Sequence, residues 1–231
     1  RKDPADVKLR KIANPRRGGV HPDDRKAATA GKPIETLPLP PRLFVSLAQH
    51  IGAPVKPLVK KGDAVLRGQV LAEAGGFISS WVHAPTSGKI VNLDELPTVS
   101  GRVAPVVEIE PDGLDALHEH CRPIADWQSL PSRELVTLIG KAGIIGMGGA
   151  GFPTQVKLSP PPDKTIDALI LNGAECEPYL TADHRLMLEE APRIWEGIRI
   201  LRHVLGIRKV YVAIEDNKPD AVAAMEKALQ G

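Results

Sequence analysis

Hydrophobic residues follow two different patterns along this chain of 231 residues. Over residues 31–112, short runs of Val, Ile and Leu alternate with Pro and Gly every few positions, which is typical of short strands joined by turns. From residue 131 onward, apolar residues recur at helical spacing, and short apolar runs between them fit buried strands. We therefore expect an all-β region followed by an α/β region.

The α/β region carries clear boundary signals. Ser132 is a candidate N-cap residue, and Gly206 is expected to end a helix that begins near Pro192. The apolar runs 166–171 and 210–214 predict two buried strands. Further helices are predicted over 181–190 and from Pro219. Because strands and helices alternate, we expect a parallel sheet, whose ligands bind beyond the carboxyl ends of the strands.

A loop of very small residues, which we call the glycine loop (residues 146–154), is the most unusual segment. Five of the eleven residues from Gly146 to Val156 have side chains no larger than a methyl group. Backbone N–H groups in such a loop can close on an anion, and Lys157 can add a charge for a phosphate. The loop matches G-x-G-x-x-G, but no strand is expected to lead into it. The alternative is a tight loop that only requires glycine torsions.

Acidic residues follow both predicted strands. The run Asn172-Gly173-Ala174-Glu175-Cys176-Glu177-Pro178 comes directly after the first strand, and Glu215-Asp216-Asn217 follows the second. Their position at strand ends favours a ligand site. Together with the glycine loop, they predict a nucleotide-type cofactor held by the loop and an acidic strand end.

Composition excludes several classes of function. The formal net charge of +2 gives no reason to expect a nucleic-acid partner. No run of eighteen apolar residues is present, so we expect no transmembrane segment, and no signal-peptide pattern is recognised. Cys121 and Cys176 are too few for a disulfide scaffold or an iron–sulfur cluster, and the cytoplasm is the default compartment. The run His118–Cys121 lacks a second ligand cluster, so no metal site is expected in this chain.

The all-β region resembles the barrel-sandwich hybrid fold of biotinyl and lipoyl carrier domains. The resemblance rests on turns at Gly62-Asp63 and Gly68-Gln69, each followed by a strand, and on a second turn and strand over 83–91. Carriers present a modifiable Lys at a hairpin tip, but the corresponding stretch, residues 74–80, has none. A structural or docking module is therefore favoured over a carrier.

Four features in order carry a wider resemblance: the run Gly18-Gly19-Val20-His21-Pro22, the carrier-like barrel, the glycine loop and the run Asn172–Pro178. In this order they resemble the RnfC subunit of the Rnf ion-translocating electron-transport complexes. The C-terminal half is similar to the FMN- and NADH-binding subunit of respiratory complex I. Family members continue into further domains, so we expect an N-terminal part of the RnfC subunit.

The resemblance implies a division of the chain into four parts. Residues 1–30 hold nine Lys or Arg against four Asp and are expected to form a basic arm. This arm is either a solvated tail or a contact for acidic lipid or a partner subunit. A barrel-sandwich hybrid domain is expected over 31–114, a linker over 115–130, and a parallel-sheet α/β flavin-binding domain over 131–231.

The resemblance also assigns ligand-binding roles to individual residues. The FMN residues it implies are Gly146, Gly148, Gly149, Lys157, Asn172 and Glu175. Phe152 and Glu177 are implied for NADH, with Glu215 and Asp216 as weaker candidates. The wider family has an Arg where Met147 stands here, so one charge is missing. We expect Cys176 to be a buried, inert thiol.

The function implied is electron transfer from NADH through FMN to iron–sulfur clusters. Two [4Fe-4S] clusters are expected in the whole subunit, with ligands outside this chain. The complex would couple electron transfer between NADH and ferredoxin to ion translocation, with this subunit and its partner subunits on the cytoplasmic face of the bacterial inner membrane. The alternative is a non-catalytic relative that binds quinone or partner proteins.

Overall fold

The computed structural model describes residues 23–99, 101–147 and 149–230. These residues form two compact units. Unit 1 combines the described residues up to Thr36 with those from Lys164 onward, and unit 2 spans Leu37–Asp163. The expected arm lies mostly outside the described residues, as does the run Gly18–Pro22. Within the described residues, no helix is both long and apolar enough to cross a membrane.

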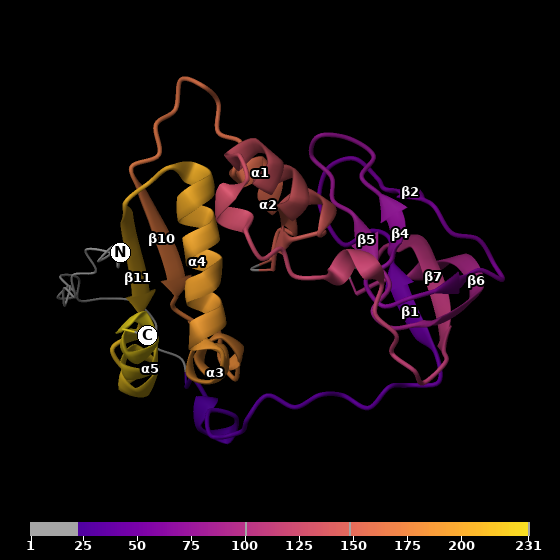
Figure 1. Ribbon diagram of the computed structural model, residues 1–231. Helices are drawn as coiled ribbons and strands as arrows, with labels where there is room; N and C mark the ends of the chain where they lie inside the picture. The colour runs from indigo at the N-terminus through magenta and orange to yellow at the C-terminus, as the bar shows by residue number, and fades with distance from the viewer. Residues whose placement is uncertain (1–22, 100, 148, 231) are drawn as a thin grey trace. The chain divides into compact units, whose positions relative to one another are not determined.

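Unit 2 contains two antiparallel sheets (Figure 1). The larger has the strand order β1 (Leu43–Ser46), β7 (Val103–Pro111), β6 (Gly88–Pro97), β3 (Ala64–Val65). The smaller has the order β2 (Lys56–Pro57), β4 (Val70–Glu73), β5 (Val82–His83). These strands fall where the Pro- and Gly-punctuated pattern predicts them.

The barrel core forms because residues along these strands alternate between core and solvent. In β7, Ala104, Val106 and Ile109 are buried while Glu110 is exposed. Leu71, Ile90 and Ile109 are completely buried. Burying a side chain of this kind stabilises a fold by about 1.5–3 kcal/mol. The all-β region therefore has a hydrophobic core of its own.

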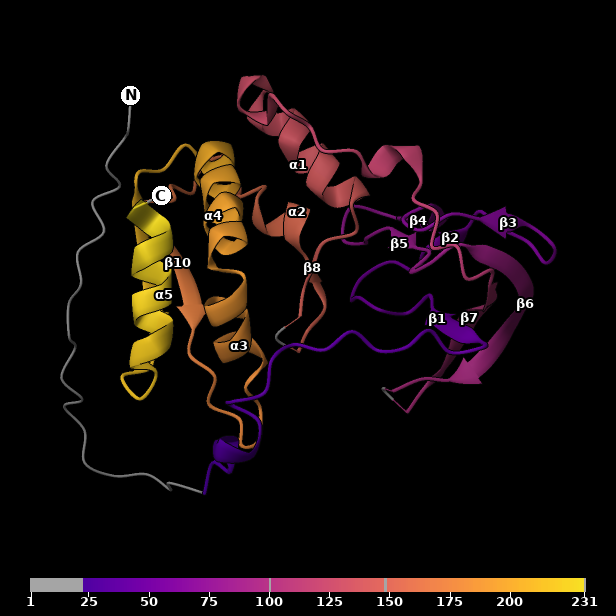
Figure 2. The same ribbon diagram turned by 60° about the horizontal axis from the view of Figure 1, so that its bottom comes forward.

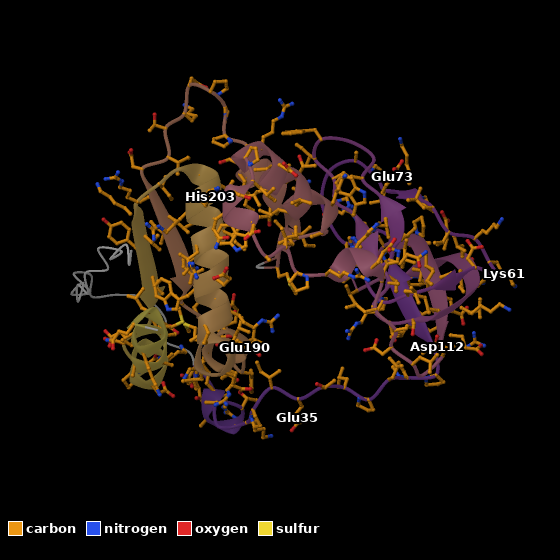
Figure 3. The ribbon with its side chains drawn as sticks, in the orientation of Figure 1. Glu35, Lys61, Glu73, Asp112, Glu190 and His203 are labelled. Carbon is orange, nitrogen blue, oxygen red and sulfur yellow. The ribbon has the colours of Figure 1, made fainter. Side chains whose placement is uncertain are left out.

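Side chains beyond the strands complete the barrel. Asp112, labelled in Figure 3, accepts hydrogen bonds from Ser87 Oγ at 2.7 Å and from the Leu114 N–H at 2.9 Å. The Ser87 hydroxyl, followed by the Leu114 amide, lowers the pKa of Asp112 below its ordinary value. These bonds satisfy a fully buried serine where β7 leaves the sheet.

Unit 2 also holds the segment that follows the barrel. Two short 3-10 helices, η2 (Glu119–Cys121) and η3 (Trp127–Ser129), precede α1 (Ser132–Lys141). Ser132 is the first helical residue and Pro131 occupies the N-cap position, one residue before our prediction. The hairpin of β8 (Ile145–Gly146) and β9 (Phe152–Pro153) follows, and then α2 (Thr154–Lys157).

Unit 1 is an α/β layer (Figure 2). Strands β10 (Ala168–Gly173) and β11 (Lys209–Ile214) pair in parallel, with Ile170 opposite Tyr211. The helices are α3 (Ala182–Glu189), α4 (Ala191–Leu205) and α5 (Pro219–Gln230), and η1 (Lys26–Ala28) lies near the N-terminus. The described residues contain this one parallel pair, which is narrower than the sheet that we expect from the sequence.

The three helices pack on one face of that strand pair. Val210, Met187, Trp195 and Met225 are buried together, whereas Ile170 on the opposite face is 66% exposed. The Trp195 indole N–H donates to the Met225 carbonyl oxygen at 2.8 Å and joins α4 to α5. As predicted, Gly206 ends α4 in the left-handed conformation, which glycine adopts without steric cost.

Candidate functional site

The glycine loop is the tip of a tight antiparallel hairpin. Gly146 pairs with Phe152, and Ile145 pairs with Pro153. The expectation that no strand leads into the loop is therefore wrong, because β8 does so over two residues. A strand this short leaves no periodic signal in the sequence. Gly148 lies outside the described residues.

Lys157 lies beside the start of this loop. It ends α2, it is exposed, and a Cβ atom added to Gly146 would lie 2.6 Å from its Nζ. The missing side chain of Gly146 is therefore what leaves room for the ammonium group. A cation next to bare backbone fits a phosphate-type ligand.

Two further glycines give the loop its shape. Gly149 has a φ of +118°, and a Cβ built there meets no atom within 4 Å. Gly151 has a φ of +58°, and a Cβ built there would lie 2.8 Å from the Gln49 carbonyl oxygen. The Ile51 N–H also donates to the Gly151 carbonyl at 3.3 Å. One side of the loop is thus packed against the barrel, and the backbone at Gly149 stays open.

A small pocket lies near the hairpin within unit 2. His50, Ser80, Trp81 and His83 line it, and its volume is about 120 Å³. Pockets for drug-sized ligands measure about 300–1,000 Å³, so this one does not accommodate a flavin. The His50 ring is already hydrogen-bonded to the Ile51 carbonyl and to the Ser80 backbone. Burial lowers the pKa of His83, against a bond to Lys141 that raises it.

The carboxyl ends of β10 and β11 bring the two acidic runs of unit 1 together. Gly173 pairs with Ile214 at the end of the register. One residue beyond, the Glu175 N–H donates to Glu215 Oε2 at 3.3 Å. Asn172 is exposed, and its Oδ1 accepts the Ala174 N–H at 3.1 Å. Parallel strands end at the same edge of a sheet, which is why the sequence could predict this meeting.

Glu175 is the buried member of this group. Only 4% of it is exposed, and its Oε1 accepts the Asp183 N–H at 2.9 Å, at the start of α3. Its Oε2 is buried and has no hydrogen-bond partner among the described residues. A buried carboxylate oxygen without a partner is costly, which is consistent with a position kept for a polar ligand. Cys176 is exposed, so the expectation of a buried thiol is wrong.

The remaining predicted residues are accessible. Glu177 and Asp216 are exposed, and Phe152 is half-buried beside the glycine loop. Phe152 belongs to unit 2, whereas Glu177 and Asp216 belong to unit 1. Among residues 23–99, 101–147 and 149–230, no three His, Cys, Asp or Glu side chains are grouped as in a metal site. The His118 and His120 rings contact each other, with centroids 4.5 Å apart.

Sequence reasoning missed the cations that surround the acidic residues. Lys218 is 3% exposed and pairs with Glu215, and Lys26 donates to the Glu175 carbonyl oxygen. Burial raises the pKa of Glu215, but the Lys218 and Glu175 hydrogen bonds and the nearby lysine charges bring it below its ordinary value. Lys218 lies three residues after Glu215, a spacing that could have suggested the pair.

Asp183 and His184 are two other residues that the sequence did not single out. Burial, followed by the charges of Glu175 and Glu177, raises the pKa of Asp183, while Lys26 opposes this. His184 is buried, and its Nε2 lies 3.0 Å from Asp220 Oδ1, which links α3 to α5. The acidic strand end is thus embedded in a charged network.

Both halves of the chain match known families. Residues 139–231 match the family described as Nuo51 FMN-binding domain, and residues 15–114 match the RnfC barrel sandwich hybrid domain. The second match confirms the barrel-sandwich prediction. The first covers the glycine loop and both acidic runs.

Curated relatives align along most of the chain. The RnfC subunit of the proton-translocating ferredoxin:NAD(+) oxidoreductase complex of Clostridium ljungdahlii is 49% identical over 93% of this chain. The same subunit of the Na(+)-translocating complex of Acetobacterium woodii is 44% identical over 92%. The chain belongs to the RnfC family. A third relative, the corresponding subunit of the ion-translocating oxidoreductase complex of Rhodobacter capsulatus, is 45% identical over 91%. The chain spans 47%, 48% and 41% of these three proteins.

Proposed function

We propose that this RnfC homologue is the NADH-interacting flavin subunit of an ion-translocating electron-transport complex. The observation that carries the proposal is the match of residues 139–231 to an FMN-binding family, because this span contains the glycine loop and the acidic strand ends. When bound, FMN supplies the ability to accept an electron pair from NADH and to pass electrons singly to iron–sulfur clusters.

In unit 2, Gly146, Gly148 and Gly149 offer backbone groups to the flavin, and Lys157 offers its charge to the flavin phosphate. The exposed Lys157 ammonium beside Gly146 supports this role. Phe152 offers a ring face to NADH. The glycine positions let a ligand approach the main chain closely, which any larger side chain would prevent.

In unit 1, Asn172 and Glu175 are the proposed flavin contacts, and Glu177 the proposed NADH contact. The unpartnered Oε2 of Glu175 and the exposed side chains of Asn172 and Glu177 support these roles. Carboxylates repel phosphates but accept hydrogen bonds from sugar hydroxyls and amides. Glu177 therefore suits a ribose or the nicotinamide amide. Glu215 and Asp216 remain weaker candidates, since Glu215 is already paired with Lys218.

We further propose that the subunit binds the cytoplasmic face of the bacterial inner membrane together with partner subunits. There the complex couples electron transfer between NADH and ferredoxin to ion movement. The names of the relatives support this, because each is the corresponding subunit of a translocating complex. The two expected [4Fe-4S] clusters would be bound by residues outside this chain.

The proposal is tested with the protein purified at its natural full length. It is titrated with FMN while flavin fluorescence is recorded, and NADH is then added without oxygen. Saturable binding followed by loss of the visible flavin absorbance supports the proposal. Binding without this loss would refute the NADH role and favour a non-catalytic relative. A protein that binds no FMN would refute the flavin role.

A further inference from the structure

Within unit 1, residues 23–36, which we call the N-terminal segment, contact the residues that follow β10. We call residues 174–181 the acidic loop. The Tyr179 N–H donates to the Asp24 carbonyl oxygen at 2.7 Å, and Thr29 Oγ1 donates to the Tyr179 carbonyl oxygen at 3.0 Å. About 150 positions of sequence separate these partners. Figures 1 and 2 both show the segment, with η1 in indigo, at the lower end of α3.

The same segment continues along α3. Arg185 Nη1 donates to the Ala30 carbonyl oxygen at 3.2 Å, and the Ile34 N–H donates to Glu189 Oε1 at 3.1 Å. Glu35, labelled in Figure 3, lies near the end of this contact. The segment is therefore held at the acidic loop and also along the helix that follows the loop.

Lys26 is the buried cation at the centre of this contact. It is 9% exposed, and its Nζ donates a hydrogen bond to the Glu175 carbonyl oxygen. Lysine is rarely buried unless its charge is paired or hydrogen-bonded. The charge of Lys26 acts on the carboxylates of Asp183, on α3, and of Glu215, after β11. Glu175 and Glu177 add further negative charge in the same place.

We propose that Lys26 is a positioning residue of the nucleotide site, which holds the main chain of the acidic loop at Glu175 and offsets the negative charge around it. The inference rests on the proposed function and extends it, because it makes a residue of the N-terminal segment part of NADH binding. Glu177 is two residues from the carbonyl that Lys26 holds. Fixing that carbonyl restricts the backbone that carries Glu177. A dinucleotide carries phosphates, so a cation within this acidic group also reduces repulsion of the ligand.

The test compares Lys26→Met with Lys26→Arg and with the control Lys32→Met. Lys32 is in the same segment and is exposed. Hydrogen exchange of the Tyr179 and Asp183 amides is measured first, in protein at full natural length without flavin. We expect Lys26→Met to speed exchange at these amides by about tenfold, as for a loop that opens locally, and Lys32→Met to leave it unchanged. Equal exchange in all variants would overturn the positioning role.

Steady-state NADH oxidation at saturating FMN is measured second. We expect Lys26→Met to raise the KM for NADH by about tenfold, with kcat changed by less than about twofold, because the residue acts on binding. Lys26→Arg should restore most of the loss, which loss of packing alone would not predict. A fall in kcat at constant KM would overturn the inference. If Lys26→Met does not fold, Thr29→Ala removes one contact with the same loop and should raise exchange at Tyr179 more mildly.

The two measurements separate the inference from the proposed function. A wild-type protein that neither binds FMN nor oxidises NADH refutes the function, whatever the exchange data show. In that case the nucleotide part of the inference also fails. Normal flavin reduction in wild type with unchanged exchange and KM in Lys26→Met refutes the inference alone.

Discussion

Replacing Gly146 with Ala should weaken FMN binding without destabilising the protein. The added Cβ would lie 2.6 Å from Lys157 Nζ, and the nearest backbone atom within 4 Å, the Phe152 carbonyl oxygen, is 3.6 Å away. Ordinary contacts begin at 3.4 Å, so the ammonium must move by about 1 Å. Lys157 is the exposed end of a flexible side chain, and this shift costs little.

The effect on affinity follows from the displaced charge. If the ammonium lies about 3 Å from a phosphate oxygen and moves about 1 Å away, the attraction falls by about 0.3 kcal/mol at a dielectric constant of about 80, or by about 1.4 kcal/mol at about 20. This corresponds to a Kd for FMN that is higher by about two- to tenfold. The φ of Gly146 is not in the left-handed region, so Ala should stabilise the fold by up to about 1 kcal/mol through the unfolded state.

The assay is a fluorescence titration of FMN with four proteins: wild type, Gly146→Ala, Lys157→Ala and the double variant. Lys157→Ala should raise the Kd further than Gly146→Ala, because it removes the charge altogether. In the double variant, Gly146→Ala should add nothing, since the group that it displaces is gone. If Gly146→Ala weakens binding equally with and without Lys157, the reasoning about the ammonium is refuted. Thermal unfolding of each variant provides the control for stability.

Three further predictions concern other parts of the structure. Gly151→Ala should destabilise unit 2 by about 2–3 kcal/mol in thermal unfolding, because its φ of +58° and the Gln49 carbonyl oxygen 2.8 Å from the new Cβ both oppose a side chain; an unchanged melting temperature would contradict the packing of the loop on the barrel. Glu177→Gln should slow NADH oxidation more than it lowers flavin content, and equal losses would count against its assignment to NADH. Glu215→Gln should lower the melting temperature at neutral pH, because the pKa of Glu215 is below its ordinary value of 4.5 in the folded state, where Lys218 pairs with it. This stabilisation is fully present well above pH 4.5 and is lost as pH falls through the depressed pKa, so wild type and variant should converge in acid; a constant difference between them at every pH would contradict the ion pair.

Local chemistry explains why much of the fold could be predicted. Pro and Gly punctuation placed the strands of the barrel, and Gly206 ended α4 as expected, because turns and helix ends depend on the torsions of a few neighbouring residues. Parallel strand order brought Asn172–Glu177 and Glu215 to one sheet edge. The residue types of the glycine loop and of Lys157 were also sufficient to mark a candidate phosphate site.

The amino-acid sequence by itself determined the two structural regions, the glycine loop and the acidic strand end, because each is encoded by residues that are close together in the chain. Only the tertiary structure decided which of those residues are buried and what they contact. Glu175 is buried with an unpartnered oxygen, Cys176 is exposed, and Lys26 reaches Glu175 across 149 positions. No periodic pattern encodes a contact between a segment and a loop so far apart, since its partners are set by how the whole unit packs.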